Sequence, residues 1–428
     1  MRTSETASAA GTATAELERF RRDARSWLAA NLQLDVPGGR GARRFRHLTP
    51  EDVTAERALQ RRLFDAGYAG IATPTEYGGQ GLSQAHQRAF DQEAAAYRLP
   101  DFGVVSGTTE LCLRTMLAHG GPDLLVGHVP RILAGDEVWA QFFSETEAGS
   151  DLAGVRTRAE WRDGRWVING GKVWSSGAYF CDYGMALTRT NWTVPKHRGL
   201  TWFAIPLTAP GVSVLPINQI NGDTEFCQEF FDDVTIEDSE RIGAVDDGWT
   251  VAQTVLVLER GFAEEGATSS ANLAGEVSDL IRLARKSGNS DDPVVRQQVA
   301  AAMISDFAVA TVEERVQEHM AVNGSADAGV AAYAALAAGV AAPERAKIAI
   351  RIAGLHALMW STDDPGGAVI AEEYLNSRRK AIAGGTNEIQ RNAIGERVLG
   401  LPREPSFDSR KPFGEVIRDA KNWNGRVS

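Results

Sequence analysis

Residues from about 138 to 247 are a series of short β-rich runs between two long stretches that have the periodicity of helices. Within this region, Asp163-Gly164 is a strong signal for a two-residue hairpin turn. The turn places Trp161 opposite Trp166 on the two strands of the hairpin. The pattern therefore predicts an antiparallel sheet or barrel between helical regions.

The flanking regions are predicted to be helical, so the expected fold class is α+β multidomain. Near the N-terminus, apolar side chains recur on one helical face, and Ala-rich segments after Gly248 predict a bundle of long antiparallel helices. A last helix is expected near Asn387, with Gln390 completing a capping box. The expected parts are a disordered start at 1–14, a helical domain at 15–137, a β-domain at 138–247, a helical bundle at 248–403 and a partly extended tail at 404–428. The apolar face comprises Leu17, Phe20, Ala24, Trp27 and Leu28, and the Ala-rich segments are 249–264, 269–286, 293–322 and 326–355.

Composition and charge argue against several classes of protein. A formal net charge of −11 makes a nucleic-acid-binding role improbable. The three cysteines, Cys112, Cys181 and Cys227, form no CxxC pair, and the chain has no HExxH, so neither a disulfide framework nor a metal site is expected. Because no apolar stretch approaches the length of a membrane span and residues 2–14 do not resemble a signal peptide, a cytoplasmic location is expected.

Two polar motifs in the β-rich region are candidates for a cofactor site. Gln141–Glu145 and Ala148–Asp151 form a small-residue turn with free hydroxyls, and Lys172–Ser176 carries a second hydroxyl pair behind a tryptophan. Small residues let backbone N–H groups reach anionic oxygens, and an indole covers one face of a flat ring system. The alternative is a surface turn and a buried core tryptophan, which either motif alone would favour.

The order of these and later motifs resembles that of the flavin-dependent acyl-CoA dehydrogenases over about residues 15–403. The resemblance implies FAD in a cleft between the sheet domain and the bundle. The matching blocks are Phe143-Ser144-Glu145 with Ala148–Asp151, Ile168–Trp174, Lys196–Leu200, Phe230–Val234, Gly248-Trp249, Gly384–Asn392 and Glu396–Glu404. By position, the residues expected to contact FAD are Gln141, Phe143, Ser144, Gly149, Ser150, Trp174, Ser175, Ser176, Thr386, Asn387 and Glu388, with Arg285 reaching the FAD of a neighbouring subunit.

The chain departs from the family pattern at three places. Thr146-Glu147 replaces the usual Pro-Gly between the two parts of the first motif. Gly288 stands where the family often has a Phe after the arginine represented here by Arg285. The glycine-rich stretch usually found near residues 352–358 is replaced by Ala353-Gly354-Leu355-His356.

Glu259 is the predicted catalytic base. The family carries its base at one of two positions; one is Gly384 here and cannot act, and the other is Glu259, followed by Arg260. Trp249, Ala252, Leu256 and Glu259 also share one helix face, and the neighbouring face is apolar. A carboxylate in so apolar a segment is costly unless it is paired or functional, so a structural ion pair is the alternative. Arg260 is expected to orient the base or substrate, or else to be a surface arginine.

The reaction implied is dehydrogenation of an acyl-CoA thioester to a trans-2-enoyl-CoA, with Glu259 removing the α-proton. Ser150 and Arg260 are the expected substrate contacts, Glu388 is the rival acid, and an electron-transfer flavoprotein is the expected acceptor of electrons. The family is usually tetrameric, either as a homo-oligomer or as a heterotetramer with a related subunit. Two alternatives stay open: a non-catalytic, FAD-sharing partner subunit, and an oxidase or monooxygenase that uses O₂.

Overall fold

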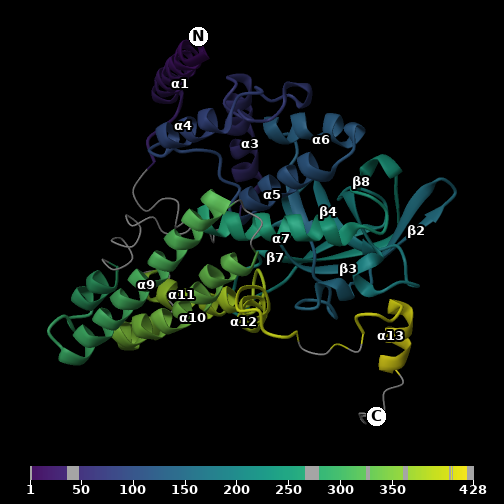
Figure 1. Cartoon of the computed structure of the whole chain (residues 1–428). Helices are drawn as coiled ribbons and strands as arrows, with labels where there is room; N and C mark the ends of the chain where they lie inside the picture. The colour runs from purple at the N-terminus through teal and green to yellow at the C-terminus, as the bar shows by residue number, and fades with distance from the viewer. Residues whose placement is uncertain are drawn as a thin grey trace. The chain divides into compact units, whose positions relative to one another are not determined.

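The computed structural model describes residues 2–35, 48–265, 279–323, 328–359, 365–403, 406 and 408–421. The chain divides into two compact units (Figure 1). The first unit comprises Met1–Asn218, Thr224–Val251 and Arg410–Ser428, and the second comprises Gln219–Asp223 and Ala252–Ser409. The helical and β-rich regions of the N-terminal half therefore fold together.

The N-terminal helices pack around a small apolar core. Ala24 and Leu28 of the first helix are fully buried, and Phe20 and Trp27 pack against the same cluster, as their shared helical face predicts. The first helix begins at Arg2, so the start that the sequence predicts to be disordered is helical from that residue. The helices are α1 (Arg2–Asn31), α3 (Pro50–Asp65), α4 (Gln84–Ala94), α5 (Val104–His119) and α6 (Pro122–Ala134).

The β-rich region forms an eight-stranded sheet in the order β6-β7-β3-β2-β4-β5-β8, with β1 paired to β4. Most neighbours are antiparallel, but β4 pairs in parallel with both β1 and β2. The predicted hairpin is confirmed, because Trp161 is opposite Trp166 and their rings lie 5.2 Å apart. The strands are β1 (Trp139–Phe142), β2 (Arg158–Arg162), β3 (Arg165–Ser176), β4 (Tyr183–Arg189), β5 (Leu200–Pro206), β6 (Val212–Pro216), β7 (Phe226–Ile236) and β8 (Arg241–Ile242).

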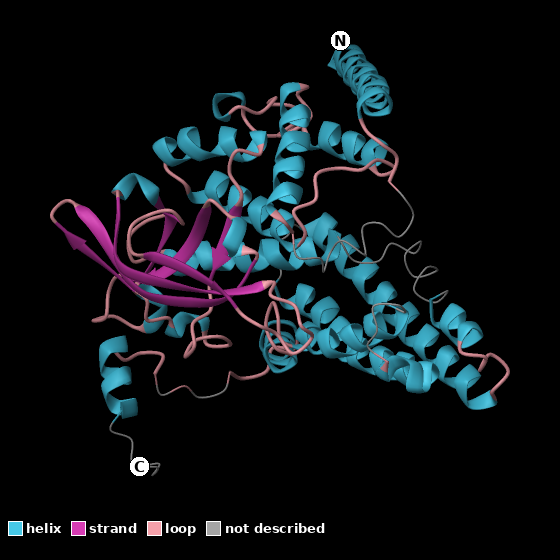
Figure 2. Cartoon of the chain, turned by 180° about the vertical axis from the view of Figure 1, so that it is seen from behind, coloured by secondary structure: helices cyan, strands magenta, loops and turns pink. Residues whose placement is uncertain are grey.

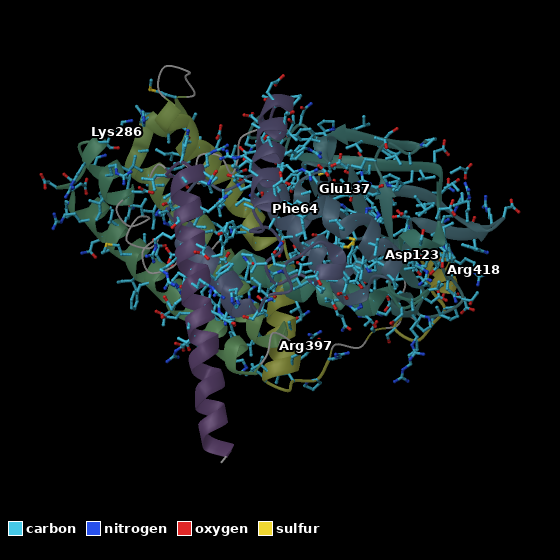
Figure 3. The ribbon with its side chains drawn as sticks, turned by 90° about the horizontal axis from the view of Figure 1, so that it is seen from above. Phe64, Asp123, Glu137, Lys286, Arg397 and Arg418 are labelled. Carbon is cyan, nitrogen blue, oxygen red and sulfur yellow. The ribbon has the colours of Figure 1, made fainter. Side chains whose placement is uncertain are left out.

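A buried histidine joins the helices to the sheet. His128 on α6 is within 2.8 Å of Glu137 through Nδ1 and within 2.9 Å of Glu240 through Nε2. Burial lowers the pKa of His128, but the hydrogen bonds and charges of the two carboxylates outweigh this and raise it to about 9. His128 is therefore a cation at neutral pH that ties α6 to the residues beside β1 and β8; Glu137 is labelled in Figure 3.

The second unit is helical (Figure 2). The pair α9–α10 has a core that includes Val299, Ala302, Ala349 and Ile352. The predicted helices at 293–322 and 326–355 are confirmed within a few residues, while residues 269–278 of the predicted 269–286 helix lie outside the described residues. The helices are α7 (Gly248–Glu265), α9 (Pro293–Asn323), α10 (Ala328–Ala353), α11 (Pro365–Asn376) and α12 (Asn387–Ala393), and α7 starts within the first unit.

The capping box predicted near the C-terminus was wrong. Thr386 caps α12 by accepting a hydrogen bond from the Ile389 N–H at 3.3 Å, which places the expected capping residue one position too late. Gln390 consequently makes no capping box, and its amide instead donates to the carbonyls of Gly384 at 3.0 Å and Gly385 at 3.1 Å. The tail, expected to be partly extended, contains helix α13 (Phe413–Lys421), whose Phe413 ring lies 4.1 Å from the Arg189 guanidinium.

Candidate functional site

The first motif folds as a tight turn after β1. The backbone N–H of Glu145 donates to the Ala148 carbonyl at 3.0 Å, and the Ala148 N–H donates back to Glu145 at 3.1 Å. Thr146 and Glu147 are exposed between them. The turn therefore closes with the Thr-Glu pair in place of Pro-Gly, and the extra charge of Glu147 lies in solvent.

A buried ion pair fixes this turn to strand β3. Lys172 donates from Nζ to Glu145 Oε1 at 2.8 Å and to the Phe143 carbonyl at 3.0 Å. Glu145 also accepts hydrogen bonds from the backbone N–H groups of Arg156 at 2.6 Å and Thr157 at 2.9 Å. Burial raises the pKa of Glu145, but Lys172 and these donors outweigh it, so the pKa lies below its ordinary value and Glu145 is a carboxylate.

The structure places the two motifs side by side. The Val173 N–H donates to the Ser144 carbonyl at 3.0 Å, one residue from the contact between Lys172 and Phe143. Phe143 packs edge-on against Trp202, with ring centroids 4.9 Å apart. Segments separated along the chain therefore lie next to each other in the first unit.

Trp174 is exposed, not part of the core. The pairing of β3 with β7 shifts register between Val173 and Ser175, so Trp174 is the extra residue of a bulge, and its φ is 70°. Such a φ is rare for a bulky residue and marks a conformation that the surrounding pairing imposes. The side chain of Trp174 is 58% exposed, and its ring meets Phe226 edge-on at 5.8 Å.

The bulge sends the two following hydroxyls in different directions. Ser176 Oγ donates to Glu225 Oε1 at 3.1 Å, whereas Ser175 is buried and donates to the carboxyl group of Glu229 inside the sheet. Sequence reasoning missed both glutamates. The alternation of β7, in which Cys227, Glu229 and Phe231 are buried, is the signal that identifies an inward-facing acid.

Exposed residues of the two motifs are of the kind that could hold a flat, anionic cofactor. Gly149 and Ser150 are exposed beside the turn, and a Cβ added at Gly149 would meet no atom within 4 Å. An exposed indole next to an open small-residue turn matches a ring system with a diphosphate tail. Within the described residues, no cluster of three or more His, Cys, Asp or Glu side chains is arranged to hold a metal ion.

The predicted base lies in the second unit. Glu259 is half-buried on α7, on the helix that also carries the fully buried Ala252 and Val255. Leu256 and Leu258 are half-buried, which agrees with the apolar faces expected from the sequence. The side chain of Arg260 lies outside the described residues, so its expected role remains a prediction.

The remaining predicted contacts also lie in the second unit. Thr386 uses its hydroxyl as the cap of α12, and Asn387 packs close to α10, since a Cβ at Gly339 would lie 2.3 Å from Asn387 Oδ1. The carboxylate of Glu388 is 76% exposed and 3.4 Å from Arg391. Arg285 is exposed near the end of its helix, next to Lys286, which Figure 3 labels.

Two of the three departures from the family pattern have a defined local structure in this unit. Gly288 has a φ of 70° and follows the helix end, where its N–H donates to the Arg285 carbonyl at 3.1 Å, so this position serves the turn. Gly354–Leu358 is a short 3₁₀ helix with Leu355 80% exposed and Leu358 73% exposed. A glycine-rich loop is therefore replaced by a short helix that presents apolar side chains.

Comparison with known families gives consistent matches along the chain. The profile of the acyl-CoA dehydrogenase N-terminal domain matches residues 14–136, that of the middle domain matches 140–234, and that of the C-terminal domain matches 246–399. The acyl-CoA dehydrogenase IpdE1 of Mycolicibacterium smegmatis is 36% identical over 91% of this chain and 99% of its own length.

Solved structures agree with this match. A variant of the Tcur3481–Tcur3483 steroid ACAD is similar with a TM-score of 0.72 and 26% identity, covering 91% of this chain and 100% of its own. The ChsE4–ChsE5 complex from Mycobacterium tuberculosis is similar with a TM-score of 0.68 and 27% identity, covering 91% and 98%. No helix in the described residues is both long and apolar enough to cross a membrane.

Proposed function

The chain belongs to the acyl-CoA dehydrogenase family, and we propose that it is an FAD-dependent enzyme that converts an acyl-CoA thioester into a trans-2-enoyl-CoA. The observation that carries the proposal is the surface formed by exposed Trp174 and the turn at 143–151, in a chain that also keeps a carboxylate at Glu259. The first feature suits a flavin, and the second suits removal of a proton next to a thioester carbonyl.

Each unit carries residues that we propose as FAD contacts. In the first unit, the proposed contacts are the backbone of Gln141–Ser144, the Gly149-Ser150 turn, Trp174 and Ser176, of which Gly149, Ser150 and Trp174 are exposed. Ser175 is proposed to support the site indirectly, because its hydroxyl donates a hydrogen bond to Glu229. In the second unit, Thr386–Glu388 are the proposed contacts, and Arg285 is proposed to reach the FAD of a neighbouring subunit.

Glu259 is the proposed base for the α-proton, and bound FAD would supply the acceptor for the hydride of the β-carbon. Val251, Ala252 and Val255 on the same helix are buried and apolar, and a carboxylate in so apolar a segment carries a free-energy cost unless it is paired or functional. Ser150 and Arg260 are the proposed substrate contacts. Glu388 is a poorer candidate for the base because its carboxylate is largely exposed and close to Arg391.

The acyl group and the electron acceptor are further proposals. The similar solved structure is described as a steroid ACAD, which favours a bulky acyl group, as does the position of the base on the early bundle helix. An electron-transfer flavoprotein is the proposed acceptor. An oxidase or monooxygenase on the same scaffold is distinguished by rapid reoxidation of the reduced flavin in air, and anaerobic bleaching against a panel of acyl-CoAs identifies the preferred substrate.

The purified protein is expected to be yellow and to release FAD on heating. The physical reason is that exposed Trp174 and the turn at 143–151 cover a flavin by stacking and hydrogen bonding, without a covalent link. Chromatography of the released material identifies the flavin. A colourless, well-folded oligomer that takes up no added FAD contradicts the proposal.

Trp174→Ala should weaken FAD binding. Trp161→Ala, at another exposed tryptophan, is the control and should leave FAD binding unchanged.

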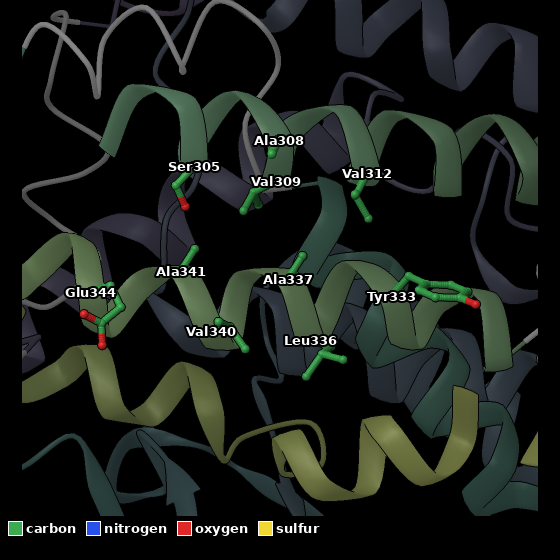
Figure 4. Close-up of a pocket in the computed structure, with 10 residues that line it drawn as sticks. All are labelled: Ser305, Ala308, Val309, Val312, Tyr333, Leu336, Ala337, Val340, Ala341 and Glu344. Carbon is green, nitrogen blue, oxygen red and sulfur yellow. The ribbon is translucent and has the colours of Figure 1, made fainter. Parts of the chain in front are cut away.

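An apolar groove in the second unit supports assembly with another subunit of this family. It lies between α9 and α10, has a volume of about 450 Å³ and is drawn in Figure 4. Beside it on α9, Ile304 is 72% exposed and Phe307 is 70% exposed, which is unfavourable for a chain alone in water. The groove residues are Ser305, Ala308, Val309, Val312, Tyr333, Leu336, Ala337, Val340, Ala341 and Glu344.

Light scattering is expected to show at least a dimer, either of this chain alone or with a related subunit. Phe307→Asp should shift the protein toward the monomer, because a charge in a buried apolar contact is costly. Glu314→Lys, an exposed change on the same helix, is the control. A stable wild-type monomer that holds a full complement of FAD would contradict both the assembly and the proposed role of Arg285 across subunits.

A further inference from the structure

Glu229 is a fully buried acid that the proposed reaction does not use. Its side chain has no solvent exposure, and it lies on β7 directly opposite Lys172 of β3. Oε1 accepts the hydrogen bond from Ser175, while Oε2 is buried without a hydrogen-bond partner among the described residues. Burying an oxygen without a hydrogen-bond partner costs less free energy when the carboxyl group is neutral than when it is charged.

Few charged groups face this acid. From β3 the facing groups are Lys172 and the Ser175 hydroxyl; from β6 the opposite residue is Val214; and Cys227 is its titratable neighbour on β7. The Lys172 ammonium donates hydrogen bonds to Glu145 and to the Phe143 carbonyl, and among the described residues it makes no hydrogen bond to Glu229. The buried Lys172 ammonium therefore interacts with two acids, Glu145 and Glu229, and it is hydrogen-bonded to Glu145 of the turn.

Burial raises the pKa of Glu229 to about 8, although the Ser175 hydrogen bond and Lys172 both act to lower it. In the folded protein the acid is therefore mainly protonated below about pH 8, whereas in the unfolded chain it is ionised above its ordinary pKa of 4.5. Its contribution to stability is fully present below pH 4.5 and is lost as the pH rises through about 8.

We propose that Glu229 is a positioning residue for the cofactor surface, an inference that rests on the proposed FAD site. As a neutral acid it binds Ser175 beneath the bulge that presents Trp174, and it leaves Lys172 to hold Phe143 and Glu145. When Glu229 is ionised, its carboxylate competes with Glu145 for the Lys172 ammonium. The turn at 143–151 then loses part of its attachment to β3.

The test compares wild type with Glu229→Gln, which keeps the shape and an oxygen acceptor for Ser175 but cannot ionise. Two readouts are followed from about pH 6 to about pH 10. One is the dissociation constant for FAD, and the other is amide hydrogen exchange of residues 143–151 and 172–176 in the FAD-free protein, corrected for intrinsic exchange. Asp232→Asn is the matched control, because it removes the charge of an exposed acid on the same strand.

In wild type and in Asp232→Asn, FAD affinity is expected to fall by about tenfold and exchange at both segments to increase as the pH passes about 8. In Glu229→Gln, both quantities should stay at their low-pH values. A wild-type profile without this transition, or the same transition in Glu229→Gln, overturns the proposal. If the exchange transition occurs but FAD never binds, the positioning network stands and the proposed function fails.

Discussion

Glu259→Gln is expected to lower the rate of acyl-CoA dehydrogenation by about 10²–10⁴ while leaving FAD content and melting temperature unchanged. Loss of a positioned general base has a cost of this order, or about 3–5 kcal/mol in the barrier. Glutamine keeps the shape of the side chain but cannot accept the α-proton. The measurement is single-turnover bleaching of the flavin with an accepted acyl-CoA. Glu314→Gln, at an exposed position on α9, should retain full activity.

The same variant separates the two roles considered for this residue. If Glu259 were a structural ion-pair partner, removing its charge would leave a buried cation unpaired, and unfolding would become easier by about 3–5 kcal/mol. Full activity in Glu259→Gln would remove Glu259 from the mechanism altogether.

Restoring the base from the second family position gives a further check. Gly384→Glu is combined with Glu259→Gly. A Cβ added at Gly384 would meet no atom within 4 Å, but the φ of 68° at this position disfavours any residue with a Cβ. Partial recovery of activity would show that both positions serve the same substrate carbon.

Lys172→Met is expected to lower the free energy of unfolding of the first unit by about 3–5 kcal/mol. The substitution leaves the buried carboxylate of Glu145 with only the backbone donors of Arg156 and Thr157. It also frees the Phe143 carbonyl, so the turn beside Trp174 should lose its fixed position. Urea unfolding followed by tryptophan fluorescence measures the change in stability, and equilibrium titration measures FAD affinity.

A matched surface pair gives the control for this experiment. Lys411 lies 3.2 Å from Asp419, and both side chains are about half exposed, at 48% and 61%. Lys411→Met should therefore cost no more than about 1 kcal/mol. A loss for Lys172→Met as small as that of the control would show that Glu145 is not held by Lys172.

The sequence by itself predicted the division into helical and β-rich regions, because helical and strand periodicities are local properties of the chain. It also predicted the pairing of Trp161 with Trp166, since a two-residue turn fixes the register of its own hairpin. The helix that carries Glu259 was also predictable from the sequence, because its apolar residues recur at helical spacing.

Only the tertiary structure decided which side chains of the second motif reach the surface. The β-bulge at Trp174 depends on how β3 pairs with β7, a strand distant in the sequence, and it turns Trp174 outward and Ser175 inward. Glu229 could be recognised as a partner of Ser175 only after this pairing was known. Local patterns determine which elements form, whereas the register between distant strands determines the direction in which each side chain points.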